Sequence, residues 1–198
     1  MTDPQRPRLG VLLSGSGRTL DNLCARIDGD ELDADIAVVV GSRACPGVEK
    51  AERRSIPARI IPGEPTAEQL DALINEFTLD LIVLAGYLRR VPITERSRGR
   101  VLNIHPALLP DFGGPGMHGM HVHRAVIEAA GRGEVTRTGC TVHLCDETYD
   151  TGAILLQRDC TIEPGDTPQS IADKVFALEC EAYPQAIAQV LAQLANSH

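Results

Sequence analysis

The sequence predicts a single α/β domain: a mostly parallel, twisted sheet with helices on both faces and an antiparallel hairpin in its C-terminal part. In the first half, apolar runs typical of buried strands alternate with segments of helical periodicity. In the second half, a polar, glycine-containing turn joins two strand-like runs, which is typical of a hairpin. The length of 198 residues and the hydrophobic content of 43% suit one sizeable core.

The first half is expected to contain five strands and three helices. Strands are predicted where short apolar runs end in turn residues, at Leu9–Ser14, Asp35–Gly41, Ala58–Ile61, Leu81–Ala85 and Arg100–His105. Helices are predicted between them, at Arg18–Asp28, Gly47–Arg54 and Pro65–Phe77. This alternation favours parallel strands, because each intervening helix returns the chain to the same end of the sheet.

The second half changes character after a glycine-rich stretch, Asp111–Met120, which we expect to be a mobile loop. A helix is predicted to follow it at His121–Ala130, and the hairpin strands at Thr138–Cys145 and Ala153–Ile162. Thr167 is expected to cap a long C-terminal helix that carries Pro168 in its first turn. Pro184 is expected to kink that helix.

Charge and composition narrow the class of protein. The 19 basic and 27 acidic residues give a formal charge of −8 without a Lys/Arg cluster, so we expect no nucleic-acid partner. Neither an export signal nor an apolar stretch of membrane-spanning length is present, which predicts a cytoplasmic protein without a membrane partner. The 6 cysteines lack a Cys-x-x-Cys pair, and we expect them to be free. The sequence leaves the oligomeric state open.

A short glycine loop, Gly15-Ser16-Gly17, follows the first predicted strand and opens the first predicted helix. At this place in an α/β sheet, free backbone N–H groups point outward and can hold an anion. Leu20 stands where a dinucleotide-binding loop has its third glycine, so the loop suits one phosphate better than NAD. An ordinary strand-to-helix turn is the alternative.

Asn103 and His105 are the first candidates for chemistry. Side chains alternate along a strand, so these two point to the same face, and Pro106 ends the strand directly after them. An amide that holds a developing oxyanion, beside an imidazole that polarises it and passes protons, is the pair that acyl or formyl transfer needs. A capping asparagine with a structural histidine is the alternative.

Asp150 lies in the hairpin turn, where its carboxylate would raise the pKa of a nearby His105 and favour the imidazolium. A simple turn former is the alternative, because aspartate is common before Thr-Gly. His118, His121 and His123 share no face at helical or strand spacing, so no metal site is predicted.

These segments resemble the folate-dependent phosphoribosylglycinamide formyltransferase family of purine biosynthesis. The resemblance runs over nearly the whole chain, and its most specific part is Asn103-Ile104-His105-Pro106 followed by a Val-His strand and the Asp150 turn. Further matching stretches are Val11 to Gly17, Leu84 to Arg89, Leu102 to Pro110, Gly139 to Asp150 and Glu179 to Pro184. The resemblance implies one Rossmann-like formyltransferase domain over residues 1–198, with a phosphate-binding half at about 8–100 and a folate-binding, catalytic half at about 100–198.

The resemblance also implies roles for single residues. His105 is expected to be the general acid, Asn103 to bind the formyl oxygen, and Asp150 to raise the histidine's pKa and assist proton transfer through water. The remaining expected contacts are Gly17, Arg18 and Thr19 for the substrate phosphate, Glu179 for the glycinamide part, and Leu88, Arg89, Arg90 and Val91 with Asn103 for the folate. Three features depart from the family pattern: Arg18-Thr19 in the glycine loop, the long loop at Phe112–Met120, and Gly63-Glu64-Pro65 in place of a basic folate contact.

The function implied is transfer of the formyl group of 10-formyltetrahydrofolate to the amine of N1-(5-phosphoribosyl)glycinamide. The products would be formylglycinamide ribonucleotide and tetrahydrofolate, in de novo IMP synthesis, with the folate as cosubstrate and no metal. A formyltetrahydrofolate hydrolase or another small-amine formyltransferase are alternatives, although no room is expected for the hydrolase's N-terminal regulatory domain or for a tRNA-binding domain. A non-catalytic nucleotide-binding module is an alternative of another class, in which Arg43 would bind the 2′-phosphate of NADP, but it leaves Asn103 and His105 unexplained.

Overall fold

A computed structural model describes residues 6–196 of the chain. Each predicted element is present there, with ends that move by one or two residues. The strands are β1 (Arg8–Leu13), β2 (Asp35–Gly41), β3 (Ala58–Ile60), β4 (Leu81–Leu84), β5 (Val101–His105), β6 (Arg137–Leu144) and β7 (Ile154–Thr161). The helices are α1 (Arg18–Asp28), α2 (Pro46–Arg53), α3 (Ala67–Phe77), α4 (Met120–Gly131) and α5 (Pro168–Ala195).

The strands form one sheet of 7 strands in the order β3-β2-β1-β4-β5-β6-β7. The chain divides into two compact units, and the boundary falls inside β5. The first unit comprises the described residues up to Leu102 and the end of α5 from Ile187. The second comprises Asn103–Ala186. The predicted division of function between two halves near residue 100 remains a prediction.

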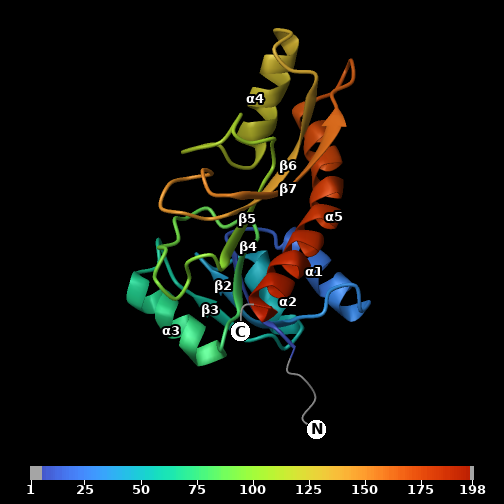
Figure 1. Ribbon diagram of the computed structural model, residues 1–198. Coiled ribbons are helices and arrows are strands. Elements are labelled where there is room, and N and C mark those ends of the chain that lie inside the picture. The colour runs from blue at the N-terminus through green and yellow to red at the C-terminus, as the bar shows by residue number, and fades with distance from the viewer. Residues whose placement is uncertain (1–5, 197–198) are drawn as a thin grey trace. The chain divides into compact units, whose positions relative to one another are not determined.

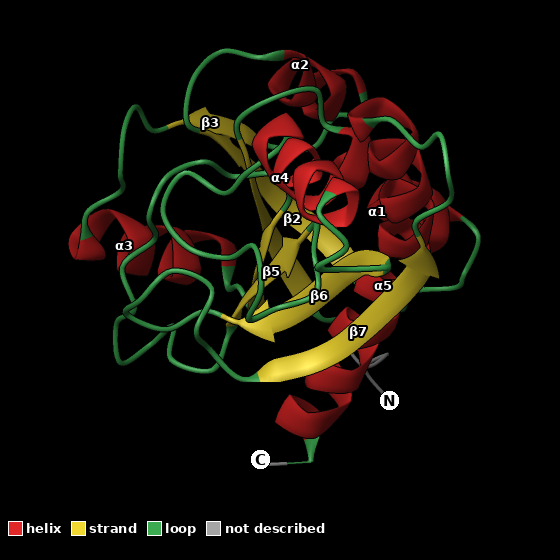
Figure 2. Ribbon diagram, turned by 90° about the horizontal axis from the view of Figure 1, so that it is seen from above, coloured by secondary structure: helices red, strands yellow, loops and turns green. Residues whose placement is uncertain are grey.

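The first unit is a parallel α/β layer. β1 pairs in parallel with β2 and β4, and β2 pairs in parallel with β3. The β4 residues are all buried, because helices cover both faces of these strands. Figures 1 and 2 show α3 on one face and α1 and α2 on the other. Thr66 begins α3 with a capping box, in which its hydroxyl accepts from the Gln69 N–H and the Gln69 side chain accepts from the Thr66 N–H.

The second unit contains the predicted hairpin. β6 and β7 pair antiparallel from Arg137↔Thr161 to His143↔Ile154, with a register shift between Val142 and His143. β6 is almost wholly buried, whereas β7 is largely exposed. Alternation on β6 therefore places Thr141 and His143 on one face of this strand.

The glycine-rich stretch before α4 contains neither helix nor strand, as the sequence predicted. Apolar contacts nevertheless anchor it, because Phe112 and Met117 pack against the buried cluster of Ala107, Val122 and Val126. Whether the loop moves, as its composition predicts, stays a prediction.

The C-terminal helix begins as predicted at a threonine cap. The hydroxyl of Thr167 accepts from the N–H of Ser170 at 3.1 Å, and the Ser170 hydroxyl accepts from the N–H of Thr167 at 2.9 Å. The helix runs on through Pro184 to Ala195 as one continuous α-helix, and the kink expected at Pro184 remains a prediction. Figure 1 shows α5 alongside β7, where the Arg158 guanidinium donates to the Gln185 side chain.

All 6 cysteines are free, as predicted. Within residues 6–196, none of the helices is both long enough and apolar enough to cross a membrane.

Candidate active site

The end of β5 carries Asn103 and His105, and the strand ends at His105 as the following proline predicts. Both side chains lie in one network of polar contacts within the second unit. His105 is buried, with only 3% of its surface exposed, so its ring contacts are made with protein groups rather than bulk water.

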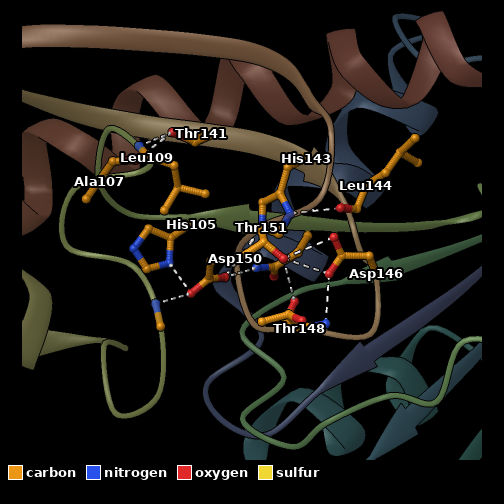
Figure 3. A network of polar contacts seen from close by, with 12 residues as sticks. His105, Ala107, Leu109, Thr141, His143, Leu144, Asp146, Thr148, Asp150 and Thr151 are labelled. Atoms are coloured by element: carbon orange, nitrogen blue, oxygen red, sulfur yellow. Dashed lines mark hydrogen bonds and ion pairs between the residues drawn. The ribbon is translucent and has the colours of Figure 1, made fainter.

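Both ring nitrogens of His105 face acceptors, and Figure 3 shows the one supplied by Asp150. Nε2 lies 2.8 Å from the carbonyl oxygen of Phe112, which can only accept, so Nε2 carries a proton. Nδ1 faces the Asp150 carboxylate, with Oδ2 at 3.7 Å. A protonated ring would therefore have an acceptor for each N–H group.

Asp150 is held by its own loop and by the glycine-rich stretch. It takes a left-handed backbone conformation, with φ of 57°, which aspartate tolerates better than most residues. Its Oδ2 accepts from the backbone N–H of Gly114 at 2.9 Å. The loop is shaped by Asp146, whose carboxylate accepts from the Thr148 N–H and the Thr151 hydroxyl (Figure 3).

His143 is a member of the site that the residue-by-residue interpretation missed. Its Nδ1 donates to the carbonyl of Leu144 at 3.0 Å, so in the neutral ring Nε2 is an acceptor. The side-chain N–H of Asn103 donates to that Nε2 at 3.1 Å and lies 3.5 Å from Asp150 Oδ1. The available signal was the alternation of β6, which carries a histidine toward the site at its last residue but one.

Burial dominates the electrostatics of His105. It lowers the pKa of the imidazole below its ordinary value of 6.5, although the charge of Asp150 and the Phe112 carbonyl raise it. This net shift runs against the expected imidazolium near neutral pH, and the catalytic role of the Asp150–His105 pair stays a prediction. The carboxylate acts in the predicted direction, but taking the charged ring out of water costs more.

The carboxyl of Asp150 shows the opposite balance. Burial raises its pKa, but the hydrogen bond from the Gly114 N–H and the two nearby imidazoles outweigh burial, so the pKa lies below its ordinary value of 3.8. A hydrogen bond from His143 Nε2, which lies 3.5 Å from Oδ1, would need a second proton on that ring, because the neutral ring carries its proton on Nδ1. Asp150 is thus a carboxylate at neutral pH. Burial and the charges of Asp150 and Asp146 raise the pKa of the neighbouring Cys145 thiol to about 12, which leaves it protonated and a poor nucleophile.

The glycine loop lies in the first unit, where Gly17 is the N-cap of α1. Its φ of 73° is left-handed, and a Cβ built on it would lie 2.7 Å from the Cα of Gly47. Both the conformation and the close approach of α2 require glycine here. Arg18 and Thr19 form the first turn of α1, whose N–H groups lack acceptors within the helix, as an anion site requires.

The stretch expected to contact folate is fastened to the glycine loop through Ser14, within the same unit. The Ser14 hydroxyl accepts from the backbone N–H of Leu88 at 2.9 Å and from the Ser42 hydroxyl at 2.8 Å. Leu88 is exposed (48%), Val91 is buried, and Arg89 and Arg90 are exposed. An exposed leucine beside two arginines could meet both an apolar ring and carboxylates.

Glu179 lies half-buried on α5 in the second unit. Burial and then the charge of Glu179 raise the pKa of Cys140 on β6 to about 12, which places the carboxylate close to that strand. The histidine cluster does not converge, because His118 and His121 are exposed with their rings edge to face, whereas His123 is buried. Across the described part of the chain, no group of three or more His, Cys, Asp or Glu side chains could hold a metal ion.

Comparison with known proteins gives concordant matches. The family model described as formyl transferase matches residues 7–187. A chloroplastic phosphoribosylglycinamide formyltransferase of Arabidopsis thaliana is 33% identical over 95% of this chain and 66% of its own length. Glycinamide ribonucleotide transformylase 1 of Symbiobacterium toebii has a TM-score of 0.79 and 33% identity, covering 94% of this chain and 88% of that one. Phosphoribosylglycinamide formyltransferase of Bacillus halodurans has a TM-score of 0.81 and 30% identity, covering 93% and 95%.

The relatives differ in how much of their own length this chain covers. The chain spans 66% of the Arabidopsis protein and 60% of the chloroplastic enzyme of Vigna unguiculata, so it covers under two thirds of those curated relatives. A formyltetrahydrofolate deformylase of Pseudomonas syringae has a TM-score of 0.78 at 26% identity, and this chain covers only 63% of it. The transformylase structures are matched over more of their length, which makes the deformylase the weaker fit.

Proposed function

This chain belongs to the formyl transferase family, and on that premise we propose that it transfers the formyl group of 10-formyltetrahydrofolate to the amine of N1-(5-phosphoribosyl)glycinamide. The products are formylglycinamide ribonucleotide and tetrahydrofolate, in de novo purine biosynthesis. Both reactants are small molecules, and the folate is a cosubstrate. The proposal needs no metal ion.

One observation carries the proposal: Asn103, His105, Asp150 and His143 form a single polar network at the end of β5. Formyl transfer requires a hydrogen-bond donor for the oxyanion and a group that moves a proton between two nitrogens. The amide of Asn103 supplies the donor, and the His105–Asp150 pair supplies the proton path.

In the proposed mechanism the substrate amine attacks the formyl carbon, and negative charge grows on the formyl oxygen. One N–H of Asn103 is engaged by His143, and the second faces Asp150 Oδ1 at 3.5 Å, so this second N–H would exchange that long contact for the formyl oxygen. The Nε2–H of His105, which the Phe112 carbonyl accepts, would turn to the oxygen from another side. Both donors already belong to the site, and each would exchange its present acceptor, the Phe112 carbonyl or Asp150, for the formyl oxygen.

Proton movement then closes the reaction. The attacking nitrogen loses one proton, and the departing folate nitrogen gains one. Asp150 is ionised and faces Nδ1 of His105, so the ring can take up the released proton while both of its N–H groups have acceptors. The lowered pKa of the ring makes the proton easy to give up again to the leaving nitrogen.

Substrate binding is proposed from the other segments. The N–H groups of Gly17, Arg18 and Thr19 would hold the phosphate, and Glu179 would accept from the glycinamide part. Leu88, Arg89, Arg90 and Val91, with Asn103, would line the folate site. A cytoplasmic location is part of the proposal, although the names of two relatives place those proteins in chloroplasts.

An assay with both substrates tests the function. Purified protein is mixed with 10-formyltetrahydrofolate, with and without phosphoribosylglycinamide, and the release of tetrahydrofolate and the formylated product are followed together. We expect release to depend on the amine, to match product one to one, and to continue in EDTA. Release without the amine would favour the hydrolase instead, and loss in EDTA with recovery on Zn²⁺ would contradict the metal-free mechanism.

A further inference from the structure

A second group of buried polar contacts lies beside the proposed catalytic residues. Its centre is Thr141, which is fully buried (0% exposed) in the middle of β6. Neither the resemblance nor the proposed mechanism gives this side chain a task. Its hydroxyl nevertheless makes three hydrogen bonds, and a buried hydroxyl with three partners is seldom incidental.

The partners are backbone groups of the segment that follows His105. The Thr141 hydroxyl donates to the carbonyl of Ala107 at 2.7 Å and accepts from the N–H of Leu109 at 3.0 Å (Figure 3). One threonine hydroxyl thus binds the C=O of Ala107 and the N–H of Leu109, two residues further along the chain. The irregular backbone there forms no strand, so these bonds replace the sheet ladder that ended at His105.

Gln157 completes the arrangement from the neighbouring strand. It stands directly opposite Thr141 in the β6–β7 register. Its side-chain nitrogen donates to the Thr141 hydroxyl at 2.9 Å and to the carbonyl of Leu109 at 3.0 Å. The two N–H groups of the amide therefore each have an acceptor, and both peptide groups of Leu109 are fixed.

The clamped segment leads straight into the site. A Cβ built on Gly113 would lie 2.7 Å from the Leu109 side chain and 3.3 Å from the Asp150 Cβ, so these three residues are in close contact. On either side of Gly113, the Phe112 carbonyl accepts from His105, and the Gly114 N–H donates to Asp150. A shift of Leu109 would therefore move the partners of both catalytic groups.

We propose that Thr141 is a positioning residue, which with Gln157 fixes the backbone of residues 107–109 and thereby sets the places of the His105 imidazole and the Asp150 carboxylate. Thr141 does not touch the reacting atoms; it acts through the segment it holds. Its kinetic consequence rests on the proposed formyl transfer, whereas its structural consequence does not.

The chain offers a matched control on the same strand. Thr138 is also buried, at 2% exposure, but its hydroxyl has no hydrogen-bond partner among the described residues. Thr141→Val and Thr138→Val make the same change in shape and polarity at two buried positions of β6. Thr141→Ser keeps the hydroxyl and removes only a methyl group, so it serves as the rescue variant.

Kinetics and NMR of the intact protein test the proposal together. Misplacing catalytic groups by about 1 Å can cost ~10²-fold in rate, so we expect Thr141→Val to lower kcat by about 10–100-fold with little change in either KM. Gln157→Leu should cost less, because Thr141 keeps its two backbone bonds. Thr141→Ser and Thr138→Val should stay within about threefold of the parent protein.

The NMR readout is the ¹⁵N and ¹H resonances of the His105 ring, assigned by comparison with His105→Gln. In Thr141→Val the Nε2–H bond to Phe112 should weaken, and its signal should shift and exchange faster, while Thr141→Ser and Thr138→Val keep the parent signal. An unchanged ring signal with folded Thr141→Val protein would overturn the proposal, as would equal kinetic losses in both valine variants. If the parent protein were inactive but the ring signal still shifted in Thr141→Val, only the proposed formyl transfer would be refuted.

Discussion

The side-chain amide of Asn103 donates to Nε2 of His143 at 3.1 Å. Because the Leu144 carbonyl accepts from His143 Nδ1, the neutral ring presents Nε2 as an acceptor. This pair of contacts fixes which end of the Asn103 amide is the nitrogen. The remaining N–H then faces Asp150 Oδ1 at 3.5 Å, and this long contact is the one it would exchange for an oxyanion.

Replacing His143 should therefore impair the chemical step through Asn103. We expect His143→Leu to lower kcat by about tenfold or more, with small changes in KM, because the amide can flip and present its oxygen to the formyl oxygen. His143→Gln can still place an acceptor near the former Nε2 and should recover much of the rate. Steady-state kinetics of both variants, alone and combined with Asn103→Ala, give the answer. Full losses that multiply in the double variant would show that His143 does not act through Asn103.

The catalytic groups should behave as a unit when removed. Loss of one oxyanion donor typically costs ~10²–10³ in kcat, so Asn103→Ala and His105→Ala should each fall by at least that much. The variant lacking both His105 and Asp150 should be little worse than the worse single variant, because each acts on the same proton. Measured kcat values for the singles and the double decide this. A His105→Ala protein with near-normal kcat would refute the mechanism.

The acidic limb of the rate profile should lie below pH 6.5. Burial holds the pKa of His105 below that value, so the neutral ring that accepts the proton is lost only when the pH falls through this lowered pKa. The titratable groups near the His105 ring are Asp150 and His143, and the charge of the Asp150 carboxylate raises the pKa of His105. Asp150→Asn should therefore move the limb to still lower pH. A profile of kcat/KM from about pH 4.5 to 8 checks the direction, and a move to higher pH would be inconsistent with it.

Arg18, rather than Gly17, is the position at which to test phosphate binding. A side chain at Gly17 would meet the Gly47 backbone and strain a left-handed residue, so Gly17→Ala should lower stability whatever the loop binds. Arg18→Ala removes a cation beside the proposed anion site, and we expect KM for phosphoribosylglycinamide to rise by roughly 3–10-fold. KM for the folate is the internal control. A rise in both KM values, or in neither, would contradict the proposal that this loop binds the phosphate.

Local pattern determined most of the fold. Strand and helix positions follow from apolar periodicity and from residues that stop an element, such as Pro106 after β5 and Thr167 before α5. The same alternation placed Asn103 and His105 on one face of a strand end. Such features depend on neighbours within a few residues, so they can be predicted from the sequence alone.

Tertiary structure decided what these residues contact and how they titrate. Asn103 meets His143 and Asp150 across 40 and 47 residues of chain, and no local period reports a pairing at that range. The sequence indicated the sign of the Asp150 effect on His105, but only the folded chain shows that burial outweighs it. The close approach of Gly17 to Gly47 and the hold of Thr141 on Ala107 and Leu109 were likewise hidden. Desolvation and packing arise from all surrounding segments at once, and therefore only the assembled fold determines them.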